Sequence, residues 1–295
     1  MYRLKSHMKE DLTSRLKSIP GFPQERIELL VERIESILSY QAKVGIFGKT
    51  GAGKSSLCNA LFGEDVAEVS DVQACTRNPQ EVFLNIGSGG IKLLDCPGVG
   101  ESLQRDEEYE ALYTSLIPKL DLVLWLIKAD DRAIAIDERF FSAVVRPHID
   151  AGKPLFIVLS QCDKIEPVRE WDVINSHPGP KQAANLRTKQ NEVAALFEIA
   201  IDRVIPVSGN ESYNVIHLVD QIIFALPKDK KISVAKKVKE QNRSEEARAD
   251  AEKGFFEAIG EEVGKFIGGS DGKDTGKRIG VFIDKFIVPF LKKWW

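Results

Sequence analysis

The chain has 295 residues, of which 43% are hydrophobic and 29% are charged, and its formal net charge at pH 7 is −3. This length allows one large domain or one domain with appendages, and the composition is that of a globular protein with a sizeable core. The small net charge argues against generic nucleic-acid binding through bulk electrostatics.

The N-terminal residues do not resemble a secretory signal peptide, and no apolar run approaches the ~20 residues of a membrane-spanning helix. The four cysteines, at positions 58, 75, 96 and 162, lack the paired spacing of a disulfide framework or a zinc site. We therefore expect a cytoplasmic protein in a reducing compartment.

The first predicted element is an amphipathic helix over Gln24–Tyr40. Gly21 and Pro23 lie just before it, where a helix is expected to start. The apolar residues of this segment fall on one helical stripe. They are Ile27, Leu30, Val31, Ile34, Ile37 and Leu38. We expect residues 1–40 to form an N-terminal helical segment.

A phosphate-binding loop follows. Gly48-Lys49-Thr50-Gly51-Ala52-Gly53-Lys54-Ser55 has the spacing of a Gly, four variable residues and then Gly-Lys-Ser. The apolar run Lys43–Phe47 before the loop predicts a buried strand, and Ser56–Phe62 after it predicts a helix. Such a loop curls successive backbone N–H groups around an anion at the helix N-terminus.

Beyond the loop, predicted strands and helices alternate up to Pro227, which favours an α/β fold. Glu81–Ile86 and Ile91–Cys96 are joined by a glycine-rich turn and predict an antiparallel hairpin. The other predicted strands are Leu122–Ile127, Leu155–Leu159 and Val204–Val207. The predicted helices are Tyr109–Leu120, Asp137–Val145, Lys181–Ala200 and Val215–Leu226. We expect a mostly parallel sheet with one antiparallel edge and helices on both faces.

Residues at the ends of these strands extend the phosphate site. Lys54 is expected to reach the β- and γ-phosphates, and Ser55 and Thr76 to coordinate Mg²⁺. Asp95 ends a strand and is expected to support the metal, while the N–H of Gly98 contacts the γ-phosphate. Lys54, Thr76 and Gly98 are therefore the predicted catalytic residues.

Asp163 follows another strand and is placed to accept two hydrogen bonds from a guanine edge, which adenine cannot donate. Ser208 and Gly209 follow the final strand and are expected to offer a backbone N–H to the guanine carbonyl. The residues predicted to bind the nucleotide are Gly48, Lys49, Thr50, Gly51, Ala52, Gly53, Lys54, Ser55, Ser56, Asp163, Lys164, Ser208 and Gly209.

The motifs Gly48–Ser55, Asp95–Gly98 and Ser160–Lys164, with Thr76 between the first two, resemble those of the translation-factor-related P-loop GTPases. The resemblance is strongest to the Era-like group with its bacterial YfjP/YeeP-type members, and it covers roughly residues 41–227. It implies a G domain that binds GTP or GDP with Mg²⁺, hydrolyses GTP slowly and acts as a molecular switch. The loop is also similar to that of septin-related and AIG1-like GTPases.

The chain departs from the family pattern in three motifs. Ser160 and Gln161 stand where the guanine motif has Asn and Lys, so base stacking and part of the polar support for the base are predicted to be missing. Val99 stands where many small GTPases have a glutamine that orients the attacking water. Gly51 stands where potassium-stimulated relatives have Asn, which predicts no strong potassium requirement.

Residues 228–295 form a third region, charged and then amphipathic. Lys228–Lys239 holds six lysines and one acid, so it is either a solvated helix face or a contact for anionic lipid or ribosomal RNA. Phe255–Ile267 and Ile279–Trp295 carry apolar stripes. The last stripe either packs on Phe255–Ile267 and Gln24–Tyr40, which we favour, or binds a membrane surface through its aromatic and basic end.

Three further alternatives stay open. Because the glutamine is absent, the chain is also compatible with a weakly hydrolysing assembly module that forms a homodimer through its nucleotide face. Septin-like, AIG1-like and dynamin-like GTPases are modules of this kind. Arg132, after the central strand, either supplies charge to the transition state or, as we favour, makes a surface salt bridge. Cys75, Cys96 and Cys162 are either redox-sensitive or, as we favour, small residues that fit tight loops.

Overall fold

The computed structural model describes residues 6–18, 24–49, 51–62, 83–86, 91–95, 103–267 and 279–294. These residues form a six-stranded sheet in the order β2-β3-β1-β4-β5-β6. The strands are β1 Ala42–Gly48, β2 Phe83–Ile86, β3 Ile91–Asp95, β4 Leu122–Lys128, β5 Leu155–Ser160 and β6 Val204–Pro206. All neighbouring pairs are parallel except β2 with β3. The predicted sheet, with one antiparallel edge strand, is confirmed.

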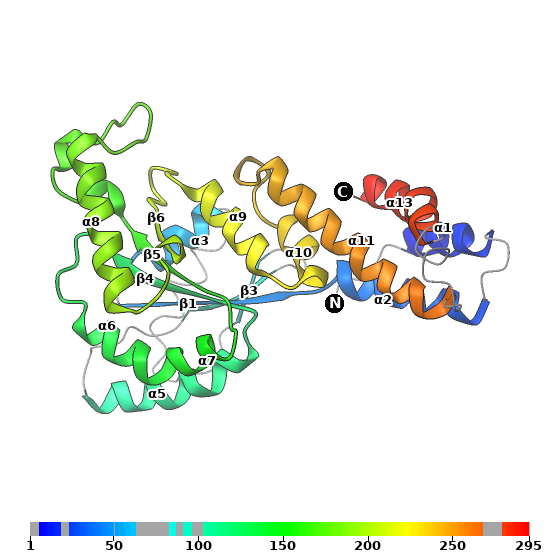
Figure 1. Ribbon diagram of the computed structural model, residues 1–295, viewed down its shortest axis with the longest axis horizontal. Helices are drawn as coiled ribbons and strands as arrows, with labels where there is room; N and C mark the ends of the chain where they lie inside the picture. Colours follow the sequence, from blue (N-terminus) through cyan, green and yellow to red (C-terminus); the bar gives the residue numbers. More distant parts are fainter. Residues whose placement is uncertain are drawn as a thin grey trace.

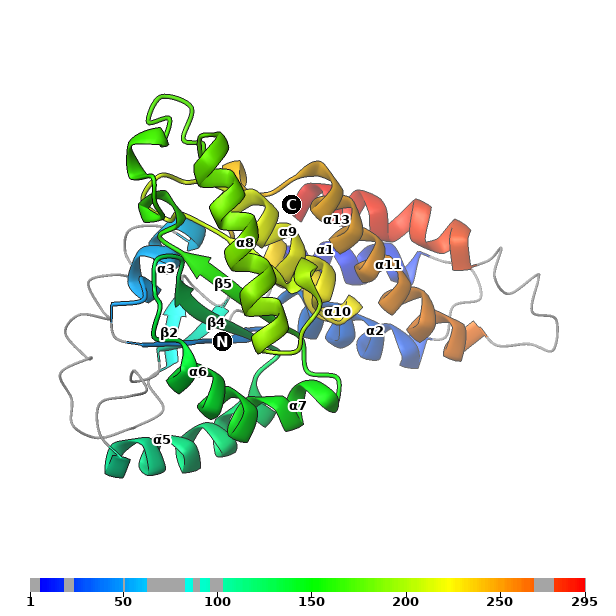
Figure 2. The same cartoon turned by 60° about the vertical axis from the view of Figure 1, so that its left-hand side comes forward.

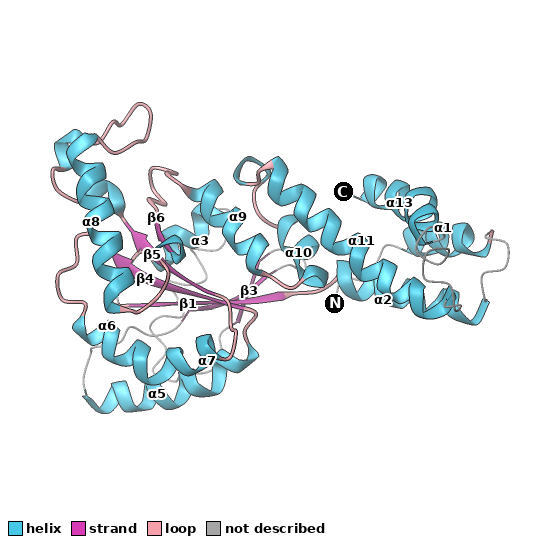
Figure 3. Ribbon diagram, in the orientation of Figure 1, coloured by secondary structure: helices cyan, strands magenta, loops and turns pink. Residues whose placement is uncertain are grey.

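Helices cover both faces of the sheet (Figure 1) and carry most of the chain outside it (Figure 3). Those of the first half are α1 Ser6–Lys17, α2 Gln24–Leu38, α3 Lys54–Phe62, α5 Leu103–Leu116, α6 Ala135–Phe140 and α7 Arg146–Asp150. Those of the second half are α8 Pro180–Leu196, α9 Val215–Ala225, α10 Lys228–Ala235, α11 Glu245–Ile267 and α13 Val288–Trp294. The helix predicted over Asp137–Val145 is longer than expected, because α6 continues through a π-helical turn at Phe141–Val145 into α7.

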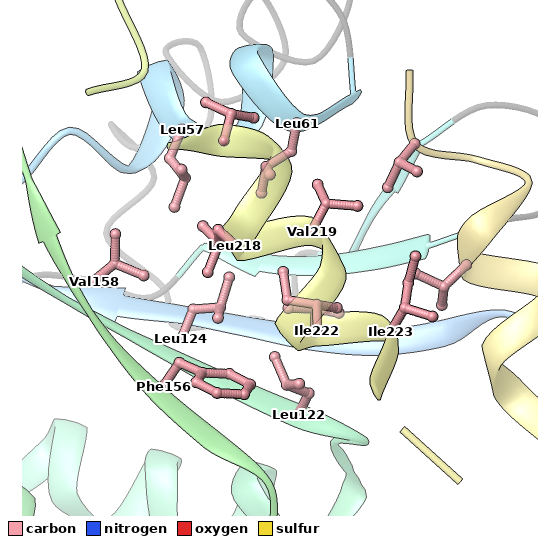
Figure 4. Close-up of a cluster of buried hydrophobic side chains, with 14 of the residues drawn as sticks. Leu57, Leu61, Leu122, Leu124, Phe156, Val158, Leu218, Val219, Ile222 and Ile223 are labelled. Atoms are coloured by element: carbon pink, nitrogen blue, oxygen red, sulfur yellow. The ribbon is translucent and has the colours of Figure 1, made fainter. Parts of the chain in front are cut away.

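The central strand β4 divides the core into two layers. Its residues Leu122 and Leu124 (Figure 4), with Leu126, pack on the face covered by α3, α9, the end of α10 and the start of α11. Val123, Trp125 and Ile127 pack on the opposite face, with α5, α6, α7 and α8 (Figure 2). This alternation follows from the two-residue period of a strand, and burial on both faces explains why β4 has a continuous apolar sequence.

A third apolar cluster lies at one end of the molecule and joins the two ends of the chain (Figure 1). It brings together α1, α2, the second half of α11 and the helical residues 279–294. Phe282, Ile287, Phe290 and Leu291 of the last segment are all at most 4% exposed. The stripe of the C-terminal segment therefore packs on Phe255–Ile267 and on α2, as the sequence favoured. The division into residues 1–40, 41–227 and 228–295 stays a prediction.

The helix α11 belongs to two of these clusters. Its early residues Ala247 and Ala251 pack against the sheet, whereas Phe255, Ile259 and Val263 lie in the third cluster. The C-terminal region also contacts the helix that follows the phosphate loop. Asn242 Nδ2 donates a 2.7 Å hydrogen bond to the carbonyl oxygen of Ala60, and Lys239 N donates to that of Leu61. These bonds satisfy carbonyls that a helix end otherwise leaves without partners.

The lysine-rich segment is tied to the protein itself. Lys230 pairs with Asp121 at 2.6 Å and Lys231 with Asp250 at 2.5 Å, and Lys228 pairs with Glu261. These three lysines are thus neutralised within the chain, which reduces the charge available to an anionic partner. None of the helices in the described ranges has the length and apolar character needed to cross a membrane.

Candidate functional site

The phosphate loop lies at the carboxyl edge of the sheet, between β1 and α3. Gly48, Gly51 and Gly53 have φ values of +142°, +81° and +84°, which favour glycine. Helix α3 begins at Lys54 and directs its N-terminus at the loop. The described part of the loop therefore has the backbone and the helix position of an anion-binding turn.

Lys54 spans the loop. Its Nζ donates hydrogen bonds to the carbonyl oxygens of Gly48 at 3.1 Å and Lys49 at 3.3 Å. Lys54 is half-buried, and these two bonds hold its ammonium against the backbone of the loop. A lysine held in this way is a point charge available to a phosphate.

Three segments far apart in the sequence line one pocket beside the loop. They are the loop and start of α3, the end of β5 with the turn after it, and the turn after β6. The lining residues are Gly53, Leu57, Val158, Ser160, Gln161, Asp163, Val207, Ser208, Gly209 and Asn210. Asp163, Ser208 and Gly209, which the sequence singled out for the base, are therefore neighbours, and Asp163 is half-buried. The pocket lies at the carboxyl ends of parallel strands, where open α/β sheets bind ligands.

Ser160 and Gln161, which replace the Asn and Lys of the guanine motif, donate hydrogen bonds to the phosphate loop. Ser160 Oγ, 5% exposed, donates a 2.6 Å hydrogen bond to the carbonyl oxygen of Ala52. Gln161 Nε2 donates to that of Gly51 at 2.9 Å, and Lys164 Nζ donates to Gln161 Oε1 at 2.8 Å. Serine and glutamine at these positions therefore support the phosphate loop, whereas the prediction that part of the polar support for the base is missing stays a prediction.

Asp163 is held by a residue that the sequence gave no reason to choose. Gln182 of α8 is fully buried, and its Nε2 donates to the carbonyl oxygens of Asp163 at 3.0 Å and Ile165 at 2.9 Å. The turn that carries Asp163 is thereby fixed to the body of the domain. Buried polar side chains are normally hydrogen-bonded, but the sequence alone does not reveal that Gln182 is buried or which carbonyl groups it binds.

The turn after β6 packs closely on α3. A Cβ atom at Gly209 would lie 2.9 Å from the carbonyl oxygen of Ser56, so only glycine fits there without displacement. Ser208 is 1% exposed, and its Oγ accepts a hydrogen bond from the N–H of Glu211. The proximity of Gly209 to the first turn of α3 closes the pocket on that side.

Several predicted residues lie outside the described part of the chain. Thr50, Thr76 and Gly98 fall there, as do Cys75 and Cys96. For Asp95 the backbone is described: it ends β3 and pairs in register with Ile46 of β1, beside the phosphate loop. The expected roles of these residues in Mg²⁺ binding and catalysis stay predictions.

The open alternatives for Cys162 and Arg132 are decided in part. Cys162 is fully buried in the core, and burial raises the pKa of its thiol, so a reactive thiolate is disfavoured. Arg132 is exposed and makes no ion pair with any residue in the described ranges, so the favoured surface salt bridge is not found among them.

Comparison with known proteins connects this geometry to a family. Residues 43–161 match the family model described as 50S ribosome-binding GTPase. The chain is 40% identical over 253 residues to the protein YkfA of Escherichia coli K12, covering 85% of each chain. It is also 40% identical over 243 residues to YfjP of the same strain, covering 82% of each. The chain belongs to this family of Era-like P-loop GTPases. The expected family is thus confirmed.

More distant relatives cover the nucleotide-binding part. The chain is 28% identical over 194 residues to the GTPase Era of Alkaliphilus metalliredigens, covering 64% of this chain and 58% of that one. The structure is similar to that of a single-residue variant of Aquifex aeolicus Era bound to GDP and AlF4⁻. That similarity has a TM-score of 0.44 and 22% identity, over 64% of this chain and 57% of that one.

Proposed function

We propose that the protein binds GTP and GDP with Mg²⁺, hydrolyses GTP slowly and acts as a nucleotide-dependent switch. The observation that carries this proposal is the single pocket in which Gly53 of the phosphate loop, Asp163 and Gly209 are neighbours. A site that holds a phosphate chain at one end and presents a half-buried carboxylate at the other fits a guanine nucleotide. The family relationship supports the same substrate.

Each residue then has a role. Lys54 neutralises phosphate charge, and the N-terminus of α3 with the loop N–H groups binds the phosphate oxygens. Ser55, in the first turn of α3, is proposed to coordinate Mg²⁺ with Thr76, and Asp95 at the end of the neighbouring β3 to hold its water ligands. The metal would neutralise charge on the β- and γ-phosphates. The Gly98 N–H would contact the γ-phosphate and thereby sense hydrolysis.

We infer slow GTP hydrolysis from the identity of the residue after Gly98. Val99 has no polar group with which to orient a water molecule for attack on the γ-phosphate. Positioning and electrostatic stabilisation supply almost all the rate enhancement of phosphoryl transfer, so the lack of a positioning group lowers the rate of hydrolysis. The GTP-bound state would therefore last long, as a molecular switch requires.

Asp163→Asn is expected to shift the preference from GTP toward xanthosine triphosphate. The asparagine amide presents an N–H donor at the position where the carboxylate would accept a hydrogen bond from guanine. Loss of a hydrogen bond to a charged group costs about 1.5–3 kcal/mol. The measurement is competitive binding of GTP, xanthosine triphosphate and ATP with and without Mg²⁺. Asp150→Asn, an exposed carboxylate at the end of α7, is the matched control. Unchanged GTP affinity in Asp163→Asn would show that the guanine assignment is wrong.

The alternative is a weakly hydrolysing assembly module that dimerises through its nucleotide face. Turnover measured against protein concentration distinguishes the two. A rate per molecule that is low and independent of concentration fits an isolated switch, and a cooperative rise fits activation by a homodimer. A ribosomal RNA or other effector contact is a separate question, tested by binding of each nucleotide state to ribosomes.

The burial of the C-terminal stripe leads to a prediction on membranes. Phe282, Ile287 and Phe290 are already packed in the third cluster, so the protein is expected not to float with liposomes of phosphatidylserine and phosphatidylcholine. Flotation is compared for the full chain and for a chain that lacks the segment from Lys277 onward. Association that is lost with the truncation would establish a peripheral membrane role for the tail.

A further inference from the structure

The side chain of Lys49, the second residue of the phosphate loop, is held by the segment between β4 and α6. Its Nζ lies 2.7 Å from Asp137 Oδ2 and 3.1 Å from Asp131 Oδ2. It also donates a hydrogen bond to the carbonyl oxygen of Ala133. Two of the three N–H donors of the ammonium thus serve the hydrogen bonds to Asp131 and Ala133, and Asp137 is held as an ion pair.

The carboxylate of Asp137 needs this partner. Its side chain is 2% exposed, and burial raises its pKa while the neighbouring Lys49 ammonium opposes that rise. Removal of one member of a buried ion pair leaves the other charge buried and uncompensated. Asp131 is 21% exposed and accepts a 2.8 Å hydrogen bond from the N–H of Ala133, which fixes the carboxylate against Lys49.

These three side chains lie at the base of the phosphate loop. Lys49 directly follows Gly48, which pairs with Leu126 of β4, and Asp131 lies three residues beyond the end of β4. Two carboxylates therefore flank a loop whose expected ligand is a chain of phosphates. With an effective dielectric constant near 20, two like charges ~10 Å apart repel each other strongly enough to weaken binding about tenfold.

We propose that Lys49 is a positioning residue of the phosphate site, whose ammonium neutralises Asp131 and Asp137 and holds the loop against the β4–α6 segment. The inference rests on the proposed function, because it assumes that the loop binds nucleotide phosphates. Lys49 acts through the two carboxylates and the loop backbone, whereas Lys54 is proposed to contact the phosphates directly. Its removal takes this positive charge away from both carboxylates and leaves Asp131 with the charge of Lys189, which donates to the backbone carbonyl oxygen of Asp131.

The test is the binding of GTP, GDP and GMP, with ATP and inorganic pyrophosphate as probes of the phosphate site alone. Lys49→Met is expected to weaken GTP binding at least about tenfold, GDP binding less and GMP binding least, because the repulsion grows with phosphate charge. Lys49→Arg keeps the charge and is expected to bind within about threefold of wild type. The triple variant Lys49→Met, Asp131→Asn, Asp137→Asn removes the repulsion and is expected to recover most of the affinity.

Lys153→Met is the matched control. Lys153 is also partly buried and donates to the carbonyl oxygens of Pro118 and Leu120, but it precedes β5, at the opposite edge of the sheet. The Lys153→Met variant is expected to be less stable in chemical denaturation, with an unchanged ratio of GTP affinity to GMP affinity.

Three results would overturn the inference. Wild-type affinity in Lys49→Met is the first, and an equal loss for GMP and GTP is the second. The third is a triple variant as weak as Lys49→Met. A wild-type protein that binds ATP in place of GTP contradicts the guanine assignment but leaves the Lys49 comparison valid with ATP. A wild-type protein that binds none of the probes contradicts both proposals.

Discussion

Lys54→Ala is expected to abolish measurable binding of GTP and GDP. Lys54 Nζ already spans the loop between the carbonyl oxygens of Gly48 and Lys49, so its charge is fixed at the phosphate site before nucleotide binds. Truncating one partner of a desolvated, hydrogen-bonded charge pair costs about 2–5 kcal/mol, which is roughly 30-fold to several-thousand-fold in affinity. Isothermal titration calorimetry with both nucleotides measures the loss.

Lys253→Ala is the control for Lys54→Ala. Lys253 lies on α11 with a side chain that is 74% exposed, so its removal is expected to change neither affinity nor stability appreciably. Retention of the wild-type GDP affinity by Lys54→Ala, in a protein whose unfolding curve is unchanged, would exclude Lys54 from the phosphate site.

Gly48→Ala is expected to combine a loss of stability with a loss of nucleotide binding. Gly48 has φ +142°, and a Cβ atom there would lie 2.5 Å from the carbonyl oxygen of Leu126 and 3.1 Å from its Cβ. The unfavourable φ costs about 1–3 kcal/mol, and overpacking against the rigid backbone of β4 costs about as much again. Relief of the clash moves the loop away from β4, and the phosphate site with it. Urea denaturation and GDP binding are measured on the same variant.

Gly51→Ala separates the cost of the unfavourable φ from the cost of the steric clash. Gly51 also has a positive φ, +81°, but a Cβ atom there would meet nothing within 4 Å. This variant is therefore expected to show only the cost of the unfavourable φ, and to remain the more stable of the two. Equal loss of stability in both variants would show that the contact with Leu126 is not what restricts position 48.

The sheet was predictable because its signals are local. The apolar run of β4, the glycine-rich turn of the β2–β3 hairpin and the phosphate loop each lie within a few adjacent residues. The mostly parallel orientation of the strands then followed from the alternation of strands and helices. The end of a helix was harder to predict, because α6 continues into α7 through a π turn that has no distinct sequence signal.

The supports of the site were not predictable, because they join residues distant in sequence through backbone atoms. Ser160 and Gln161 differ from the family motif in side chain, yet both donate to loop carbonyls about 110 residues earlier. A backbone carbonyl accepts from any suitable donor, so the residue type did not reveal the contact. Gln182 and the ion pairs of Lys49 were missed for the same reason: in the sequence they look like ordinary polar residues.

The contacts of the C-terminal region set an order for folding. Ala247 and Ala251 complete the apolar cover of the sheet, and Asn242 satisfies a carbonyl at the end of the helix that starts from the phosphate loop. A ribosome makes these residues only after the whole of the sheet and after α3 and α9, which cover the same face, so part of that face lacks its apolar cover until about residue 251 has emerged. The nucleotide-binding half thus acquires its final packing late in synthesis, although almost all of its own sequence is made early.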